Sequence, residues 1–375
     1  MTRTILALDF GGTKLSAALF AVDDKPVEKT SRQDAKNAEL GNVPSLAFFA
    51  SWRDLSSDTM LDLRRVITPA GADAAYELAA MVALAGEVLA GRAPDAIGVS
   101  FGGPTDHAAG SVRRSDHVRG WENVPLRDVL AAEFGCPVAV DNDANVAALG
   151  EHRFGAGRGV ADLMYVTVST GVGGGWILGG RPWRGHEGLA GEIGHTVVDP
   201  AGPLCLCGKR GCVERLASGP YMAADYVQGS RGAGEQGSGN AAESASSDAD
   251  GPVRSASEDA HSSLEPGPWN LAPGISGRDV AERAAAGNEV ARAILLRGAW
   301  ALGVGLGHAA NLMNPQRFVL GGGVTKSGEA WWAEVRRSAA ATALPDVRFD
   351  IVPAALGDDA PLWGALALAE EMEHG

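Results

Sequence analysis

The chain has 375 residues, a length typical of about two domains. It is 45% hydrophobic and 21% charged, which is the composition of an ordinary globular protein. The net charge of −14 argues against a protein that binds the phosphate backbone of nucleic acids, because such proteins usually present a basic face. The first residues do not resemble a signal peptide, and no uninterrupted run of about 18 apolar residues predicts a membrane span, so we expect a cytoplasmic protein without stable disulfides.

Strands and helices are predicted to alternate along the chain, which favours an α/β architecture. Residues 4–20 and 163–178 have the same pattern, a strand, a glycine turn and a second strand. These two similar hairpins suggest two related halves that face each other across a cleft. Further strands are predicted over 95–100 and 137–143 and before a third glycine cluster at 321–324; helical patterns cover 73–91, 126–134, 144–150, 279–313 and 360–372.

The stretch 228–268 differs from its surroundings. It is rich in Gly, Ser, Ala and acidic residues, and its only large aliphatic residues are Val253 and Leu264. Such a composition cannot bury enough apolar surface to offset the entropy lost on ordering. We predict a disordered surface insertion, for which a spacer without function is the simplest interpretation.

The glycine turns are candidate phosphate sites. In "DFGGTK", Asp9 ends a strand and Gly11, Gly12 and Thr13 follow. Glycine lets the backbone approach a phosphate, Thr13 adds a hydroxyl donor, and Asp9 can hold Mg²⁺ through water. A simple hairpin turn is the alternative. The later turns "STGVGGG" and "GGGV" strengthen the phosphate interpretation, since three glycine loops at strand ends suit a nucleotide held between two lobes.

The segment "VDNDAN" brings polar side chains to the start of a helix. Asp141, Asn142, Asp143 and Asn145 lie within five residues. A helix cap accounts for one of them. An Asn can both donate to and accept from a hydroxyl, and an ionised Asp can accept the hydroxyl proton, so this cluster suits a polyol that is activated as a nucleophile.

Three of the four cysteines, Cys205, Cys207 and Cys212, lie within eight residues. With His195, ten residues ahead, they make a His-Cys₃ set of the kind that Zn²⁺ prefers. Four protein ligands leave no open position, so such a metal would be structural. The spacing is not that of a common zinc ribbon, and free thiols remain the alternative.

The ordered motifs "LDFGGTK", "VSFGGP", "DNDAN", "STGVGGG", "GEIGH", "CLCGKRGCVE", "NPQRFVLGGGV" and "LGDDAPLWGA" resemble those of the ROK family of bacterial sugar kinases and repressors. The resemblance implies the actin-like ATPase (ribonuclease H-like) fold, with a nucleotide cleft between two α/β lobes. We expect a small lobe over 1–120, completed by a C-terminal helix over 355–375. A large lobe over 121–354 would contain the zinc loop 195–214 and the insertion.

The resemblance also implies roles for single residues. Asp143 is the expected catalytic base, and the cysteine loop would fold around zinc so that Glu192, His195 and Glu214 face the sugar. The sugar-binding set implied is Gly103, Asn142, Asp143, Glu192, His195 and Glu214. The nucleotide-binding set implied is Asp9, Gly11, Gly12, Thr13, Lys14, Thr170, Gly171, Gly173, Gly322 and Gly323.

The expected function is ATP-dependent phosphorylation of a hexose at its 6-hydroxyl, most simply glucose, with Mg²⁺ and a structural Zn²⁺. Fructose, mannose, N-acetylglucosamine and N-acetylmannosamine stay open as substrates. The family also contains sugar-responsive repressors, but only eight residues precede Asp9, too few for a DNA-binding domain. A non-catalytic regulator is a further alternative, and the presence of Asp143 argues against it. A polyphosphate-dependent kinase is another, and the presence of the cysteine loop argues against that one. We expect no nucleic-acid or membrane partner, and a homodimer or homotetramer.

Overall fold

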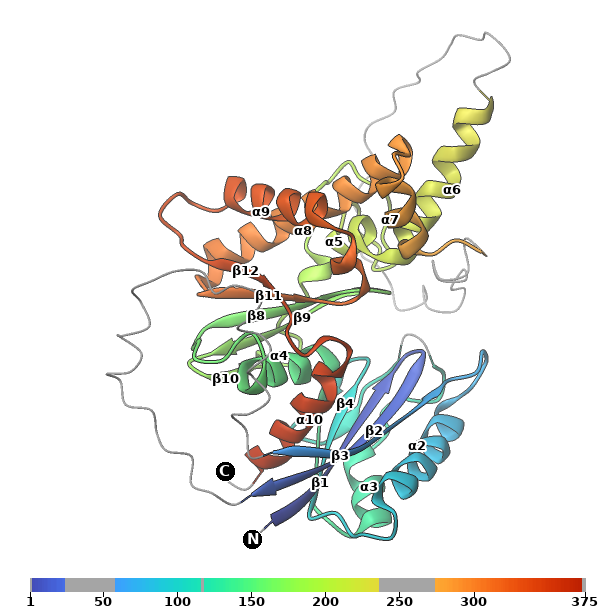
Figure 1. Ribbon diagram of the computed structural model, residues 1–375, viewed down its shortest axis with the longest axis vertical. Coiled ribbons are helices and arrows are strands. Elements are labelled where there is room, and N and C mark those ends of the chain that lie inside the picture. Colours follow the sequence, from blue (N-terminus) through green and yellow to red (C-terminus); the bar gives the residue numbers. More distant parts are fainter. Residues whose placement is uncertain (1, 24–57, 116–117, 236–273, 373–375) are drawn as a thin grey trace, which may run out of the picture.

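The computed structural model describes residues 2–23, 58–115, 118–235 and 274–372. Two five-stranded sheets, each covered by helices, form two lobes, with the first sheet at the bottom of Figure 1 and the second above it. A short ribbon of β5 (Thr105–Asp106) and β6 (Ser111–Val112) is added to the first lobe.

The first sheet has the order β3-β2-β1-β4-β7. β1 is buried along most of its length because helices cover both faces of the sheet, which explains its nearly continuous apolar sequence. Helices α2 and α3 pack on one face around Met81, Leu84 and Leu130. The bounds are β1 (Thr2–Gly11), β2 (Lys14–Asp23), β3 (Thr59–Ile67), α2 (Ala74–Leu89), β4 (Ala96–Phe101), α3 (Leu126–Phe134) and β7 (Val138–Asn142).

The second sheet has the order β10-β9-β8-β11-β12. Its outer face is covered by α5, α8 and α9, whose apolar residues include Leu302, Leu306 and Trp331. The bounds are β8 (Leu163–Val168), β9 (Val172–Leu178), β10 (Arg181–Trp183), η2 (Ile193–His195), α5 (Val213–Ala217), α6 (Gly219–Glu235), α7 (Gly277–Ala285), α8 (Glu289–Met313), β11 (Arg317–Gly321), η5 (Gly323–Lys326), α9 (Glu329–Thr342), β12 (Asp350–Pro353) and η6 (Gly357–Asp359).

The two sheets share one plan. In each, the first strand forms an antiparallel hairpin with the second, and the third strand extends that hairpin. The other two strands lie parallel on the opposite side of the first strand. The related halves expected from the two similar hairpins are therefore present.

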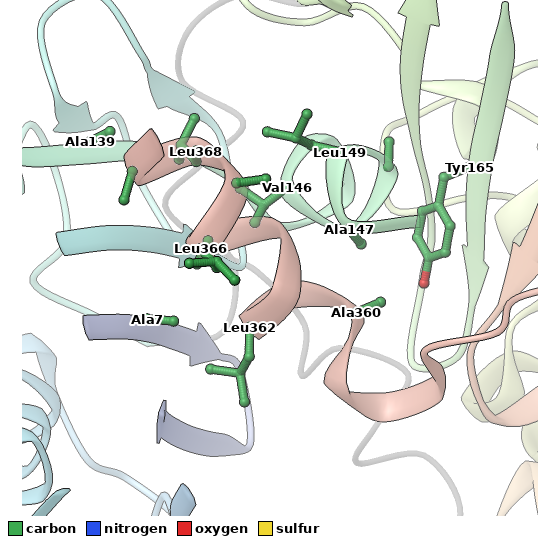
Figure 2. Close-up of a cluster of buried hydrophobic side chains, with 14 of the residues drawn as sticks. Ala7, Ala139, Val146, Ala147, Leu149, Tyr165, Ala360, Leu362, Leu366 and Leu368 are labelled. Carbon is green, nitrogen blue, oxygen red and sulfur yellow. The ribbon is translucent and has the colours of Figure 1, made fainter. Parts of the chain in front are cut away.

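Helices α4 (Asp143–Phe154) and α10 (Ala360–Glu371) lie between the sheets (Figure 1). Their apolar side chains form one buried cluster with residues of both lobes, including Ala7 from β1 and Tyr165 from β8 (Figure 2). Leu362 and Leu366 of α10 and Val146 of α4 belong to this cluster, and Leu366 lies close to Val146 in Figure 2. The C-terminal helix thus returns to the first lobe and joins it to the second.

Small residues allow this central packing. A methyl group on Gly364 of α10 would lie 1.8 Å from the carbonyl oxygen of Val146 in α4. A methyl group on Gly98 of β4 would lie 1.8 Å from the carbonyl oxygen of Ala365. Because real Cβ atoms do not approach backbone so closely, α10 can pack against α4 and the first sheet only with glycine at both positions.

The boundary expected at residue 120 lies too early in the chain. β7 pairs in parallel with β4, so the first sheet extends to Asn142. A strand at the edge of a sheet is assigned to a lobe by its partner, which local sequence does not reveal. β3 is also not among the strands that the sequence predicts.

Two helical predictions are corrected. The pattern over 279–313 is two helices, because Gly287 adopts φ +90° and Asn288 caps the new helix by accepting from Ala291 N. The insertion predicted over 228–268 begins too early, since α6 continues to Glu235. Residues 236–268 lie outside the described residues.

By length and composition alone, helix α8 could cross a membrane, since it has 25 residues and a mean hydropathy of 1.3. It is the one such helix in the described part of the chain. More than half of that apolar window is buried inside the protein. Leu295, Leu302 and Leu306 pack in the core of the second lobe. Its apolar character therefore has an explanation in the core.

Candidate active site

The strand β7 ends at Asn142 and runs directly into α4, which places Asp143 at the first turn of that helix. Asn142 is the N-cap: its Oδ1 accepts from Ala144 N at 3.0 Å. Its Nδ2 donates to the carbonyl oxygen of Gly103 and to Asp143 Oδ1, both at 3.0 Å. One side chain thus joins Gly103, Asp143 and the start of the helix.

Asp143 is held through one of its two oxygens. Oδ1 accepts from Ala144 N at 2.8 Å and from Asn142, and within the described residues no hydrogen bond engages Oδ2. Burial, together with the nearby negative charges of Asp9 and Glu192, raises the pKa of Asp143 to about 7. A carboxylate with one free oxygen and a pKa near neutrality has the properties of a general base.

Asp9, at the end of β1, lies beside Asp143. Ser100 Oγ donates to Asp9 Oδ1 at 2.8 Å, while burial raises the pKa of Asp9 to about 6. Gly102 lies between this strand end and Asp143, because a methyl group on it would be 3.6 Å from Gly12 N and 3.8 Å from Asp143 Oδ2. The first glycine turn and Asp143 therefore share one site.

A cavity of about 940 Å³ lies beside the glycine turns. Each of the three turns lines it, through Thr13, through Ser169 and Thr170, and through Gly323. The rest of the lining comes from the start of α6, from α7 and the two residues before it, and from η5 and the two residues after it. Apart from Val324, these residues belong to no motif that the sequence singled out. These are Gly219, Pro220, Ala223, Ile275, Ser276, Gly277, Arg278, Ala281, Glu282, Ala285, Val324, Lys326, Ser327 and Gly328.

The local signals for these lining residues are those of helix starts. Pro220 follows the first residue of α6, and Ser276 caps α7 in a capping box with Asp279. Such signals predict where a helix begins but not that two helix starts meet at one cavity.

Other glycines that were predicted to bind the nucleotide do not line the cavity and instead pack against neighbouring parts of the protein. Gly173 is part of β9 and faces Ala144 of α4. Gly322 adopts φ +89°, and a methyl group there would lie 2.4 Å from the carbonyl oxygen of Val168. Gly171 lies against Glu214. These glycines shape the turns, and the cavity lining does not include them or Asp9, Gly11, Gly12 and Lys14.

The cysteine loop brings four ligand atoms together. One ligand atom each from His195, Cys205, Cys207 and Cys212 lies within 4.8 Å of the others. His195 Nδ1 is 4.0 Å from Cys205 Sγ, and Cys207 Sγ is 3.5 Å from Cys212 Sγ. A tetrahedral ion with bonds of about 2.0–2.3 Å needs ligand separations of about 3.5–3.8 Å, so the residues fit a Zn²⁺ ion.

The same loop is tied to the second lobe next to the glycine turns. Val213 N donates to the carbonyl oxygen of Thr196 at 3.0 Å, which places Glu214 beside the segment that contains His195. Glu214 Oε2 accepts from Val172 N at 3.0 Å. Glu214 therefore supports the turn between β8 and β9, a role that the sequence did not reveal. Glu192, the residue before η2, is exposed and lies near enough to Asp143 for its charge to contribute to the raised pKa of that carboxyl.

Two lobes built on one sheet plan, with α4 and α10 between them and a cavity lined from both, define the actin-like ATPase fold. The polar cluster at Asp143 lies where the lobes meet. The chain belongs to the ROK family, whose model matches residues 59–372.

Known proteins extend this match to nearly the whole chain. It is 34% identical to a glucokinase of Halalkalibacterium halodurans over 75% of this chain and 78% of that protein. Among solved structures, it resembles a ROK hexokinase of Thermus thermophilus with TM-score 0.71 and 28% identity, covering 99% of this chain and 100% of that one. It also resembles a ROK family glucokinase of Streptomyces griseus in complex with glucose and AMPPNP, with TM-score 0.68 and 30% identity over 98% and 99% of the two chains.

Proposed function

We propose that this protein is an ATP-dependent hexose kinase that transfers the γ-phosphoryl group of ATP to the 6-hydroxyl of glucose. The observation that carries the proposal is Asp143, a carboxylate with one free oxygen and a pKa of about 7, beside a glycine turn that lines a cavity large enough for a nucleotide. The relatives described above are glucokinases and a hexokinase, and one of them was crystallised with glucose and an ATP analogue.

Asp143 acts on the acceptor hydroxyl. Oδ2 takes the hydroxyl proton as the oxygen attacks the γ-phosphorus, and the bond from that phosphorus to the bridging oxygen of ADP breaks. Asn142 holds Asp143 Oδ1, so the free oxygen keeps its direction. Such catalysis depends on positioning and on charge neutralisation, because the protein forms no covalent bond with the phosphoryl group.

The nucleotide would lie in the 940 Å³ cavity, with its phosphates toward Thr13, Thr170 and Gly323. Backbone N–H groups of glycine turns are suitable donors for phosphate oxygens. Asp9, buried and held by Ser100, would hold Mg²⁺ through water. Bound Mg²⁺ neutralises charge that develops on the phosphate oxygens.

The sugar would contact Gly103, Asn142, Glu192, His195 and Glu214. A Zn²⁺ ion held by His195 and the three cysteines would stabilise the loop that orients this set.

The cytoplasmic location and the homodimer or homotetramer stay predictions.

The test is release of ADP from ATP and Mg²⁺ with a panel of sugars: glucose, mannose, fructose, N-acetylglucosamine and N-acetylmannosamine. We expect the highest kcat/KM with glucose. Preference for an N-acetylated sugar would keep the kinase and replace its substrate, whereas no ADP release with any of the five would refute the proposal.

A further inference from the structure

Arg184 joins the two lobes next to the candidate base. It follows β10, the edge strand of the second sheet, and its Nε donates to Asp141 Oδ2 at 2.6 Å. Asp141 lies in β7, the edge strand of the first sheet. The side chain of Asp141 is 3% exposed and that of Arg184 22% exposed, so this is a largely buried ion pair.

Asp141 in turn holds the residues on either side of Asp143. Its Oδ1 accepts from Asn142 N at 2.8 Å and from Asn145 Nδ2 at 3.2 Å. Asn142 then donates to Asp143. A continuous chain of hydrogen bonds therefore runs from Arg184 through Asp141 and Asn142 to the candidate base.

The backbone of Arg184 starts the loop that leads to Glu192. Its carbonyl oxygen accepts from Ala190 N at 3.0 Å, which closes the loop 184–190. Within this loop, a methyl group on Gly188 would lie 3.2 Å from the carbonyl oxygen of Thr105 in the first lobe. The pair thus connects the loop before Glu192, in one lobe, with the strand end that carries Asn142 and Asp143, in the other.

We infer that Arg184 is a positioning residue of the kinase: through Asp141 it sets where Asn142 and Asp143 stand relative to Glu192. This inference rests on the proposed function. The charged and titratable groups around the pair are His107, 3.9 Å from Asp141 Oδ2, and Glu371 of α10. Burial raises the pKa of Glu371, while the charge of Arg184 lowers it and that of Asp141 raises it. His107 Nδ1 already hydrogen bonds the carbonyl oxygen of Val140 at 2.9 Å, so Arg184 is the closest cation to Asp141.

The first test is Arg184→Met in the full-length protein. Misplacing a reacting group by about 1 Å can lower a rate by about 100-fold, so we expect kcat to fall about 10- to 100-fold. The KM for ATP should change by less than about twofold, because Arg184 does not line the nucleotide cavity. The matched control is Arg317→Met. Arg317, 27% exposed, pairs with Asp350 at 3.2 Å at the start of β11, away from the site, and its loss should leave kcat unchanged.

Two further variants separate positioning from a buried unpaired charge. Arg184→Lys keeps a donor for Asp141 Oδ2 and should recover most of kcat, because Arg184 uses Nε for this bond while its Nη2 has no hydrogen-bond partner in the described residues. Arg184→Met combined with Asp141→Asn removes the unpaired carboxylate and should be more stable than Arg184→Met alone. We expect this double variant to stay slow, since the connection between the lobes is still missing.

A wild-type kcat in Arg184→Met or in the double variant would overturn the inference, as would an equal loss in Arg317→Met. If Arg184→Met does not fold, the lysine and double variants decide the question. Failure of the proposed function is a separate result, because the wild-type protein would then phosphorylate no sugar of the panel.

Discussion

Asp143→Asn tests the candidate base by its rate and its stability together. The amide keeps the size of the carboxylate and can still accept from Ala144 N, but it cannot take a proton from the acceptor hydroxyl. Loss of a general base usually lowers the rate by about 10²–10⁴-fold, so we expect kcat to fall by that factor. Glucose affinity should change little, because Asn142 and Glu192 remain.

The same variant should be more stable than the wild type, although it is slower. The pKa of Asp143 is raised from 3.8 to about 7, so the folded protein holds this proton more tightly than the unfolded chain. The stability that the proton contributes is present below about pH 4 and is lost as the pH rises through about 7. Asparagine resembles the protonated form, and it should keep that stability at high pH.

The size of the effect follows from the shift. About three pKa units correspond to about 4 kcal/mol as an upper limit, at about 1.4 kcal/mol each. Asp143 is only partly buried, so solvent screening reduces this value, and we expect about 1–2 kcal/mol. The variant should therefore exceed the wild type in free energy of unfolding at pH 8.5 by more than at pH 5.5.

The assay is denaturant unfolding at both pH values, combined with turnover of glucose and ATP. Asp128→Asn, which neutralises an exposed carboxylate in the first turn of α3, is the control. It should leave turnover unchanged, and it should change the free energy of unfolding by the same amount at both pH values. Turnover near that of the wild type would show that Asp143 is not the base. A stability difference that is the same at both pH values would show that its pKa is not raised.

Three further predictions concern the zinc loop, the core and the sugar contact. The purified protein should contain about one zinc per chain, and a chelator that removes the zinc should lower the melting temperature and raise the KM for glucose. Elemental analysis that finds no metal, together with freely reactive loop thiols, would contradict this prediction. Gly364→Ala should lower the free energy of unfolding by at least about 1–3 kcal/mol, because its methyl group would meet Val146, whereas Gly86→Ala, with nothing within 4 Å in α2, should raise it by about 0.5–1 kcal/mol. Glucose should react about 10- to 100-fold faster than 2-deoxyglucose, and Glu214→Gln should reduce this difference in rate. If the wild-type protein phosphorylates both sugars at the same rate, Glu214 does not bind the 2-hydroxyl.

Features that depend only on neighbouring residues could be predicted from the sequence. A glycine turn between two strands and a polar cluster at a strand end are local patterns, and each is present where it was expected. The His-Cys₃ set was found from ligand residue types that lie close together in the sequence, and the turn that brings Cys207 to Cys212 is built from the residues between them. The two similar hairpins even indicated the duplicated sheets.

Features that depend on packing between distant segments could be seen only in the folded protein. Asp141 and Arg184 are 43 residues apart, and only the meeting of two sheet edges makes them an ion pair. Glu214 reaches Val172 across 42 residues, and β7 joins the first sheet through its pairing with β4. A charged or polar residue has the same local sequence whether its partner is water or another lobe. Tertiary packing determines which distant residue each polar side chain contacts, so the roles of Arg184, Asp141 and Glu214 could not be predicted from the sequence alone.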